Sequence, residues 1–286
     1  MIHATGDTDR RGTRHDEVTP FGRAGPVTTC AFCGFDGKLT AEHVFADWIA
    51  RLNLPTDHVP HGAGRLNRLG RDLGTRPPFR QTVQDVCTRC NSGWMSGLEA
   101  TAQRVLSPLI LGQPHVIEPA DQASTAVWVH KTALVAMLVS SDEARAEGYG
   151  VPPSEYHDIY RARENGHPLP GTQCWIARYE GTRLASARVV PVAVVLNDHD
   201  EPDRPTGYLM TILVGQLLLQ AVRFTTSGLA INTVNVPAMQ QIWPIRSLVE
   251  RSSNQVVTDD EFLDLAGGSS HANPRCRSGP GRQPRS

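Results

Sequence analysis

The chain has 286 residues, a formal net charge of −1 and a pI of about 6.8, which excludes the uniformly basic surface of many DNA-binding domains. Its length predicts one large or two modest domains, and a hydrophobic content of 40% is enough to build a buried core. We find neither a run of the ~18–20 apolar residues needed to span a bilayer nor the apolar region of a signal peptide, and we therefore expect a cytoplasmic protein.

Polar, Gly- and Thr-rich residues 1–27 are expected to be disordered. Two Cys-x-x-Cys pairs follow, at Cys30 with Cys33 and at Cys87 with Cys90. Each pair fits one edge of a tetrahedral metal site, and four thiolates favour zinc. The sequence therefore predicts a structural Zn²⁺ site. Two disulfide bonds are the alternative, although such frameworks belong mainly to small secreted domains.

The insert between the cysteine pairs contains Glu42 and His43, and Asn91 directly follows the last cysteine of the second pair. Carboxylate and amide oxygens are ligands that suit Mg²⁺, and an imidazole that titrates near neutral pH suits a general base. Each residue also has an ordinary interpretation. A Glu-His pair is often part of a solvated surface, and Asn91 is a good N-cap for the helix expected after it.

Sequence patterns in this region predict five elements in chain order. These are a strand over 39–45, a short helix over 47–52, a long Gly-, Pro- and Arg-rich loop over 53–82, a strand over 82–86, and a helix that begins at Asn91 or Ser92 and ends near Pro108 and Gly112.

The arrangement Cys-x-x-Cys, Glu-His-Val, Cys-x-x-Cys-Asn resembles the zinc-stabilised branch of the HNH endonucleases, the ββα-metal or His-Me finger nucleases. The resemblance covers about residues 28–106, and the run from Asn91 to Glu99 is similar to a subgroup of bacterial and phage members. It implies that the four cysteines hold zinc, that Glu42 and Asn91 hold a catalytic Mg²⁺ or Mn²⁺, and that His43 is the general base. The implied products carry 5′-phosphate and 3′-hydroxyl ends.

Arginine is enriched beside these motifs, which favours a nucleic-acid partner, most simply DNA. Between Arg51 and Cys90 there are seven Arg and three Asp, a local excess of four positive charges. Guanidinium groups bind phosphate oxygens in a bidentate manner. The expected contacts are Arg65, Arg68, Arg71 and Arg89, and a solvated loop is the alternative.

The sequence patterns over residues 113–266 predict a second domain, in which helices are followed by a small antiparallel sheet. Helices are expected over 121–140 and 154–163, and strands over 173–179, 189–196, 208–214, 217–224 and 229–236. Gly215 and Gln216 predict a tight hairpin, and Pro191 predicts an edge strand. His130 and Cys174 are interpreted as core residues, and residues 267–286 as a disordered basic tail.

The sequence therefore predicts an α+β protein. A zinc-ribbon ββα-metal (HNH) module over residues 28–112 precedes helices and an antiparallel sheet. The expected activity is metal-dependent hydrolysis of nucleic acid. The alternatives are a catalytically inactive zinc-ribbon module that binds nucleic acid or protein, and a toxin or defence effector whose β domain recognises another protein.

Overall fold

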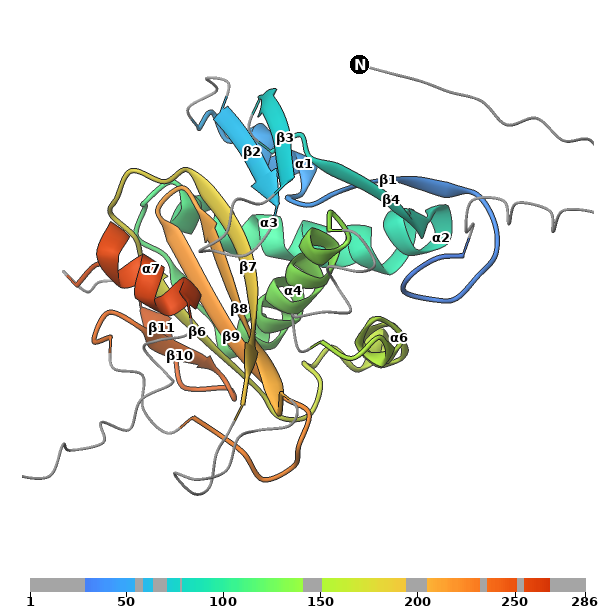
Figure 1. Cartoon of the computed structure of the whole chain (residues 1–286). Coiled ribbons are helices and arrows are strands. Elements are labelled where there is room, and N and C mark those ends of the chain that lie inside the picture. Colours follow the sequence, from blue (N-terminus) through green and yellow to red (C-terminus); the bar gives the residue numbers. More distant parts are fainter. Residues whose placement is uncertain are drawn as a thin grey trace, which may run out of the picture.

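The computed structural model describes residues 29–54, 59–63, 71–77, 79–140, 151–193, 205–231, 236–250 and 255–267. Within these ranges the protein combines helices with antiparallel sheets, which confirms the predicted α+β class (Figure 1). The expected disordered lead over 1–27 and nearly all of the basic tail lie outside the described residues. Among the helices of the described part, none is both long and apolar enough to cross a membrane.

A five-stranded antiparallel sheet in the order β10-β6-β9-β8-β7 forms the centre of the molecule. Its strands are β6 (Thr172–Arg178), β7 (Ala185–Val192), β8 (Gly207–Val214), β9 (Leu217–Phe224) and β10 (Gln240–Trp243). The turn between β8 and β9 contains Gly215, whose φ of 53° is a left-handed conformation that glycine adopts at little cost. The predicted hairpin is therefore confirmed, as is the edge position of the strand that contains Pro191.

Alternate side chains of this sheet enter two separate apolar cores, as the two-residue period of a strand requires. Cys174 and Ile176 face the core that contains α4 (Pro119–Met137). Trp175 and Ala177 face the core that contains Phe262 of α7 (Asp259–Gly267). The two helices therefore cover opposite faces of the sheet, which is buried on both sides (Figure 1).

The N-terminal region is built on a pair of antiparallel strands, β1 (Leu39–His43) and β4 (Thr82–Cys87). Helix α1 (Asp47–Ala50) follows β1. After β4 the chain is helical through α2 (Thr88–Cys90), a π-helical turn (Asn91–Met95) and α3 (Ser96–Ile110), with a kink at Gly93. Because helical conformation already begins at Thr88, the predicted N-cap role of Asn91 and Ser92 is wrong. The helix also continues through Pro108 to Ile110.

The segment predicted as a loop over 53–82 contains a second antiparallel hairpin, formed by β2 (Val59–Ala63) and β3 (Arg71–Arg76). The prediction was therefore wrong for these two stretches. Gly74, with φ of 81°, and a hydrogen bond from its amide to the Asp72 carboxylate shape the backbone of β3. Figure 1 shows this hairpin projecting beyond the end of the β1–β4 pair.

Two other expectations for the second half of the chain also differ from the structure. Residues 229–231 form no strand, and the fifth strand of the sheet is instead β10, while residues 232–235 lie outside the described part. Helix α7 was not predicted, although Thr258 and Glu261 form a capping box in which each side chain bonds to the other residue's amide. The remaining elements are β5 (Val116–Ile117), which pairs with β11 (Val249–Glu250), helix α6 (Ser154–Ala162) and a 3₁₀ turn (Arg163–Asn165).

Apolar packing is continuous from the cysteine pairs into the rest of the molecule. Phe32, between the first two cysteines, is fully buried and makes edge contacts with the rings of Trp94 and Tyr156, at centroid distances of 5.9 and 5.2 Å. Leu134 and Val135 of α4 belong to the same core. Helix α4 therefore packs against the central sheet and also against the cysteine-bearing region.

A buried polar network joins α4, α6 and the sheet. His130 Nε2 lies 2.6 Å from the Tyr208 hydroxyl, which donates to Glu155 Oε2 at 2.6 Å. Arg223 donates to the other oxygen of Glu155 at 3.2 Å. Burial lowers the pKa of His130 to about 3, with Arg223 adding to the effect, so His130 is neutral. This confirms its interpretation as a core histidine.

Replacing Tyr208 with phenylalanine is expected to destabilise the protein by about 1–3 kcal/mol, because a buried carboxylate and a buried imidazole both lose their partner. Urea unfolding at 25 °C measures the change. Tyr160→Phe is the matched control, since the Tyr160 hydroxyl makes no hydrogen bond with the described residues. Equal stability of both variants would show that the hydroxyl bridge contributes nothing.

Candidate functional site: a four-cysteine cluster beside Glu42, His43 and Asn91

The four predicted zinc ligands meet in one cluster. Cys30 and Cys33 lie in a tight turn, where Gly34 has φ of 68° and its amide donates to the Cys30 carbonyl at 2.9 Å. Cys87 ends β4 and Cys90 ends α2. The four Sγ atoms all lie within 4.8 Å of one another, and three of the four residues are buried.

The spacing of these sulfurs fits zinc. Zn–S bonds of about 2.3 Å in a tetrahedron place neighbouring sulfurs roughly 3.8 Å apart, and Cys33 Sγ lies 3.6 Å from Cys87 Sγ. The Cys87 amide also donates to the Cys30 sulfur at 3.4 Å. A hydrogen bond from the Cys90 thiol lowers the pKa of Cys30, and the same hydrogen bond together with burial raises the pKa of Cys90.

All four cysteines are free thiols, so the alternative of two disulfide bonds is wrong for this structure. Cys174 is also free and is fully buried in β6, as expected of a core residue. Burial raises the pKa of the Cys174 thiol, which keeps the thiol protonated and inert. The donor set at the cluster therefore consists of four sulfurs, and a metal such as zinc is the group that they fit.

Glu42 and His43 are the last two residues of β1, and strand alternation directs their side chains to opposite faces. Glu42 is buried, whereas His43 is half-buried and its ring makes no hydrogen bond with the described residues. An imidazole in this setting is open to a water molecule or a substrate. Strand pairing of His43 with Thr82 fixes the backbone at this point.

Asn91 lies against β1 rather than capping a helix. Its amide nitrogen donates to Thr40 Oγ1 and to the Ala41 carbonyl, both at 3.1 Å. The Ala41 carbonyl belongs to the residue just before Glu42, so Asn91 lies beside the end of β1, where the strand pairing is irregular between Thr40 and Glu42. The structure thus brings Asn91 beside the Glu-His pair, although Asn91 comes 48 positions after His43 in the sequence.

Glu42 has a partner that the sequence did not reveal, Lys131 of α4. The Lys131 ammonium, fully buried, lies 3.0 Å from Glu42 Oε1 and 2.5 Å from Glu99 Oε1. The second oxygen of Glu99 accepts hydrogen bonds from the indoles of Trp48 and Trp128, at 2.9 and 2.7 Å. Burial lowers the pKa of Lys131, but the attraction of Glu99 and Glu42 outweighs that effect and the pKa is raised, so the ammonium stays charged.

This network leaves two oxygen atoms for a further cation. Neither Glu42 Oε2 nor Asn91 Oδ1 accepts a hydrogen bond from the described part of the chain. The two carboxylates around Lys131 also carry one more negative charge than the ammonium neutralises. A carboxylate oxygen and an amide oxygen completed by waters are a donor set of the kind that Mg²⁺ and Mn²⁺ use.

The arginines predicted to contact nucleic acid are only partly described. Arg89 is exposed on α2, between the last two cysteines. Arg71 begins β3, but its side chain is not described, and Arg65 and Arg68 lie outside the described residues. Arg76 is also exposed, on the same hairpin strand as Arg71.

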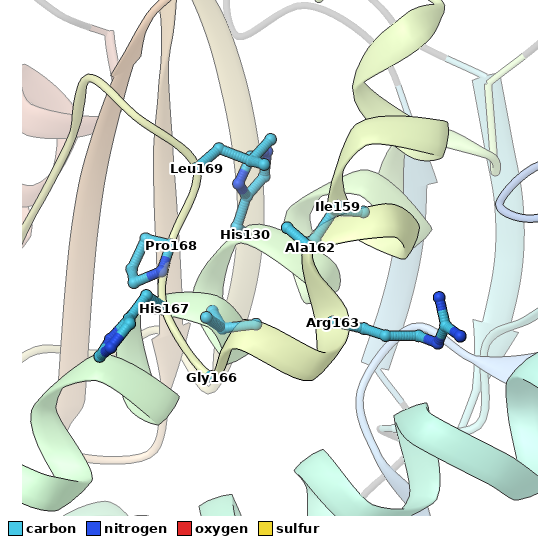
Figure 2. Close-up of a pocket in the computed structure, with 9 residues that line it drawn as sticks. His130, Ile159, Ala162, Arg163, Gly166, His167, Pro168 and Leu169 are labelled. Carbon is cyan, nitrogen blue, oxygen red and sulfur yellow. The ribbon is translucent and has the colours of Figure 1, made fainter.

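Two hollows elsewhere on the molecule do not include these residues. One, between α4, α6 and the Gly166–Leu169 turn, has a volume of about 10 Å³ and is lined by His130 and Leu169, while Arg163 points away from it (Figure 2). That volume is about the size of one water molecule, too small for a substrate. The other is an open groove of about 620 Å³ near Tyr179 and Gln216.

The geometry of the cysteine cluster and its neighbours is the evidence on function that the molecule offers, because comparisons of the chain with protein-family models, with curated proteins and with solved structures find no match.

Proposed function

We propose that the protein is a metal-dependent endonuclease of the HNH type, in which a zinc-bound four-cysteine cluster stabilises a ββα-metal site. The observation that carries the proposal is the pair of hydrogen bonds from Asn91 to Thr40 and Ala41. Those bonds gather the three residues with the chemistry for phosphodiester hydrolysis, Glu42, His43 and Asn91, at one end of the β1–β4 pair. The order strand, strand, helix around them supports the same fold.

Glu42 and Asn91 would hold a Mg²⁺ or Mn²⁺ ion, which supplies charge that polarises the phosphate and stabilises the leaving oxygen. His43 takes a proton from water as the water oxygen forms a bond to phosphorus. The bond from phosphorus to the 3′ oxygen breaks, and that oxygen takes a proton from solvent water, which gives 5′-phosphate and 3′-hydroxyl ends. Arg89, which is exposed between Cys87 and Cys90, would contact a backbone phosphate.

A cleavage assay tests this function with a matched pair of variants. The zinc-loaded protein is incubated with supercoiled plasmid, single-stranded DNA and RNA, with Mn²⁺ or Mg²⁺ and with chelator. We expect cleavage that requires the divalent ion, a loss of at least about tenfold in Asn91→Ala, and no loss in Ser92→Ala, because Ser92 is exposed and adjacent. Absence of cleavage on all three substrates by zinc-loaded protein would overturn the proposal.

A catalytically inactive zinc-ribbon module that binds nucleic acid or protein is the second candidate. The contact between Glu42 and Lys131 favours it, because an ammonium already lies against the carboxylate that the divalent cation needs. Such a module would bind one zinc and no Mn²⁺. Titration of Mn²⁺ into the zinc-loaded protein therefore separates the two functions.

A further inference from the structure

Lys131 belongs to the part of the chain for which the sequence offered no chemistry. It lies on α4, one of the helices that cover the central sheet, and it is 89 residues from Glu42. Its side chain reaches Glu42 at the end of β1, and none of its surface is exposed. A fully buried ammonium is costly unless it is paired, and here two carboxylates pair with it.

The ammonium is itself held in place by a chain of hydrogen bonds. Glu99 of α3 is fixed by the indoles of Trp48 and Trp128, and it in turn fixes Lys131. Lys131 then contacts one oxygen of Glu42, the oxygen Oε1. Side chains of α1, α3 and α4 are therefore joined at Glu99, and Lys131 links this group to the Glu42 carboxylate at the end of β1.

We propose that Lys131, held by Glu99, is a positioning residue for Glu42: it fixes one carboxylate oxygen so that the other is presented to the divalent cation. This inference rests on the proposed nuclease function. Metal-bound carboxylates are commonly oriented by a hydrogen-bond partner behind them, and the loss of such a partner typically weakens metal binding by about 10–100-fold. Lys131 has no exposed atom through which it could touch a substrate.

Electrostatic repulsion between Lys131 and the divalent cation would change the Mn²⁺ affinity in the opposite direction to positioning. The Lys131 ammonium repels an incoming cation by Coulomb's law, so if repulsion dominates, its removal will tighten metal binding. If positioning dominates, its removal will weaken binding, because the Glu42 side chain loses its described hydrogen bond. The direction of the change in Mn²⁺ affinity therefore shows whether Lys131 orients Glu42 for the cation or pairs with Glu42 in place of the cation.

The experiment measures Mn²⁺ binding to the full-length, zinc-loaded chain by electron paramagnetic resonance of the free ion. Lys131→Met removes the charge and keeps the length of the side chain. Arg223→Met is the matched control, because it breaks a different ion pair of α6 and β9, with Glu155, and leaves Glu42 untouched. Circular dichroism confirms that each variant is folded at the temperature used. Glu99→Gln, which loosens Lys131 without removing it, is a second variant should Lys131→Met fail to fold.

We expect Lys131→Met to bind Mn²⁺ about 10–100-fold more weakly, Glu99→Gln to change in the same direction, and Arg223→Met to match the wild type. Cleavage by Lys131→Met should recover partly at saturating Mn²⁺. Equal or tighter binding by Lys131→Met, while wild-type binding depends on Glu42, would overturn the positioning role and leave the nuclease function standing. Wild-type protein that binds no Mn²⁺, or binds it equally well after Glu42→Gln, would overturn both.

Discussion

Replacing Cys87 with serine is expected to release the zinc and to lower the melting temperature by about 10 °C or more. Loss of a structural metal is among the changes that cost about 4 kcal/mol or more, and each kcal/mol corresponds to about 2–4 °C in a chain near this size. Cys87 has a central place in the cluster. Its sulfur lies 3.6 Å from that of Cys33, and its amide donates to the sulfur of Cys30.

The damage should extend beyond the metal, because the cluster supports a core. Phe32 sits between two of the ligands and packs on Trp94 and Tyr156, so release of the turn that contains Phe32 exposes these rings. Zinc content by plasma mass spectrometry and thermal unfolding by circular dichroism measure both effects. Cys174→Ala is the control: it removes a buried thiol of the central sheet and should leave one zinc per chain. A Cys87→Ser protein with full zinc and an unchanged melting temperature would refute the site.

Replacing His43 with alanine is expected to slow phosphodiester cleavage by about 10²–10⁴-fold, the usual contribution of a positioned general base. Zinc content and stability should stay unchanged, because the His43 ring makes no hydrogen bond with the described residues and is only half-buried. Single-turnover nicking of supercoiled plasmid at saturating Mn²⁺ gives the rate of the chemical step. Saturating metal ensures that the comparison does not measure cation binding.

His157→Ala is the matched control for His43→Ala. His157 is exposed on α6 and lies near Gly34, beside the cysteine cluster. It belongs to neither β1 nor β4, the strands that carry and pair with His43. A general loss of activity from any histidine replacement would appear in both variants. If His43→Ala cuts as fast as the wild type, another group accepts the proton from water and the assignment of the base is wrong.

Much of the central sheet was predictable, because β8 and β9 are short apolar runs joined at Gly215 and β6 alternates along its sequence. The stretch from Gln173 to Tyr179 alternates between two apolar faces, and both faces are buried. The hairpin of β2 and β3 was not predictable in the same way. Each of its two strands contains a glycine, and neither sequence alternates regularly between apolar and polar residues. Helix α7 could have been found from the Thr258–Glu261 capping box.

At the candidate site, the four cysteines could be selected from their spacing, whereas Glu42, His43 and Asn91 were selected because the order of motifs resembles the HNH endonucleases. The structure brings the four sulfurs together and holds Asn91 against β1. Lys131 could not be assigned in that way. A charged residue inside an apolar helix indicates that a buried carboxylate must lie near it, but the sequence does not say which one. That pairing is set by tertiary packing of α4 on α3 and β1, which no local pattern encodes.

Helix α4 also constrains how the molecule can move. His130 and Lys131 are consecutive, so their side chains leave the helix axis roughly 100° apart, and each is fixed to a different body. His130 is bonded to Tyr208 of the sheet, and Lys131 to Glu42 of β1. The helix cannot rotate about its axis or slide along it without breaking both contacts. A displacement of the sheet relative to the β1–β4 strand pair therefore requires that at least one of these buried contacts break.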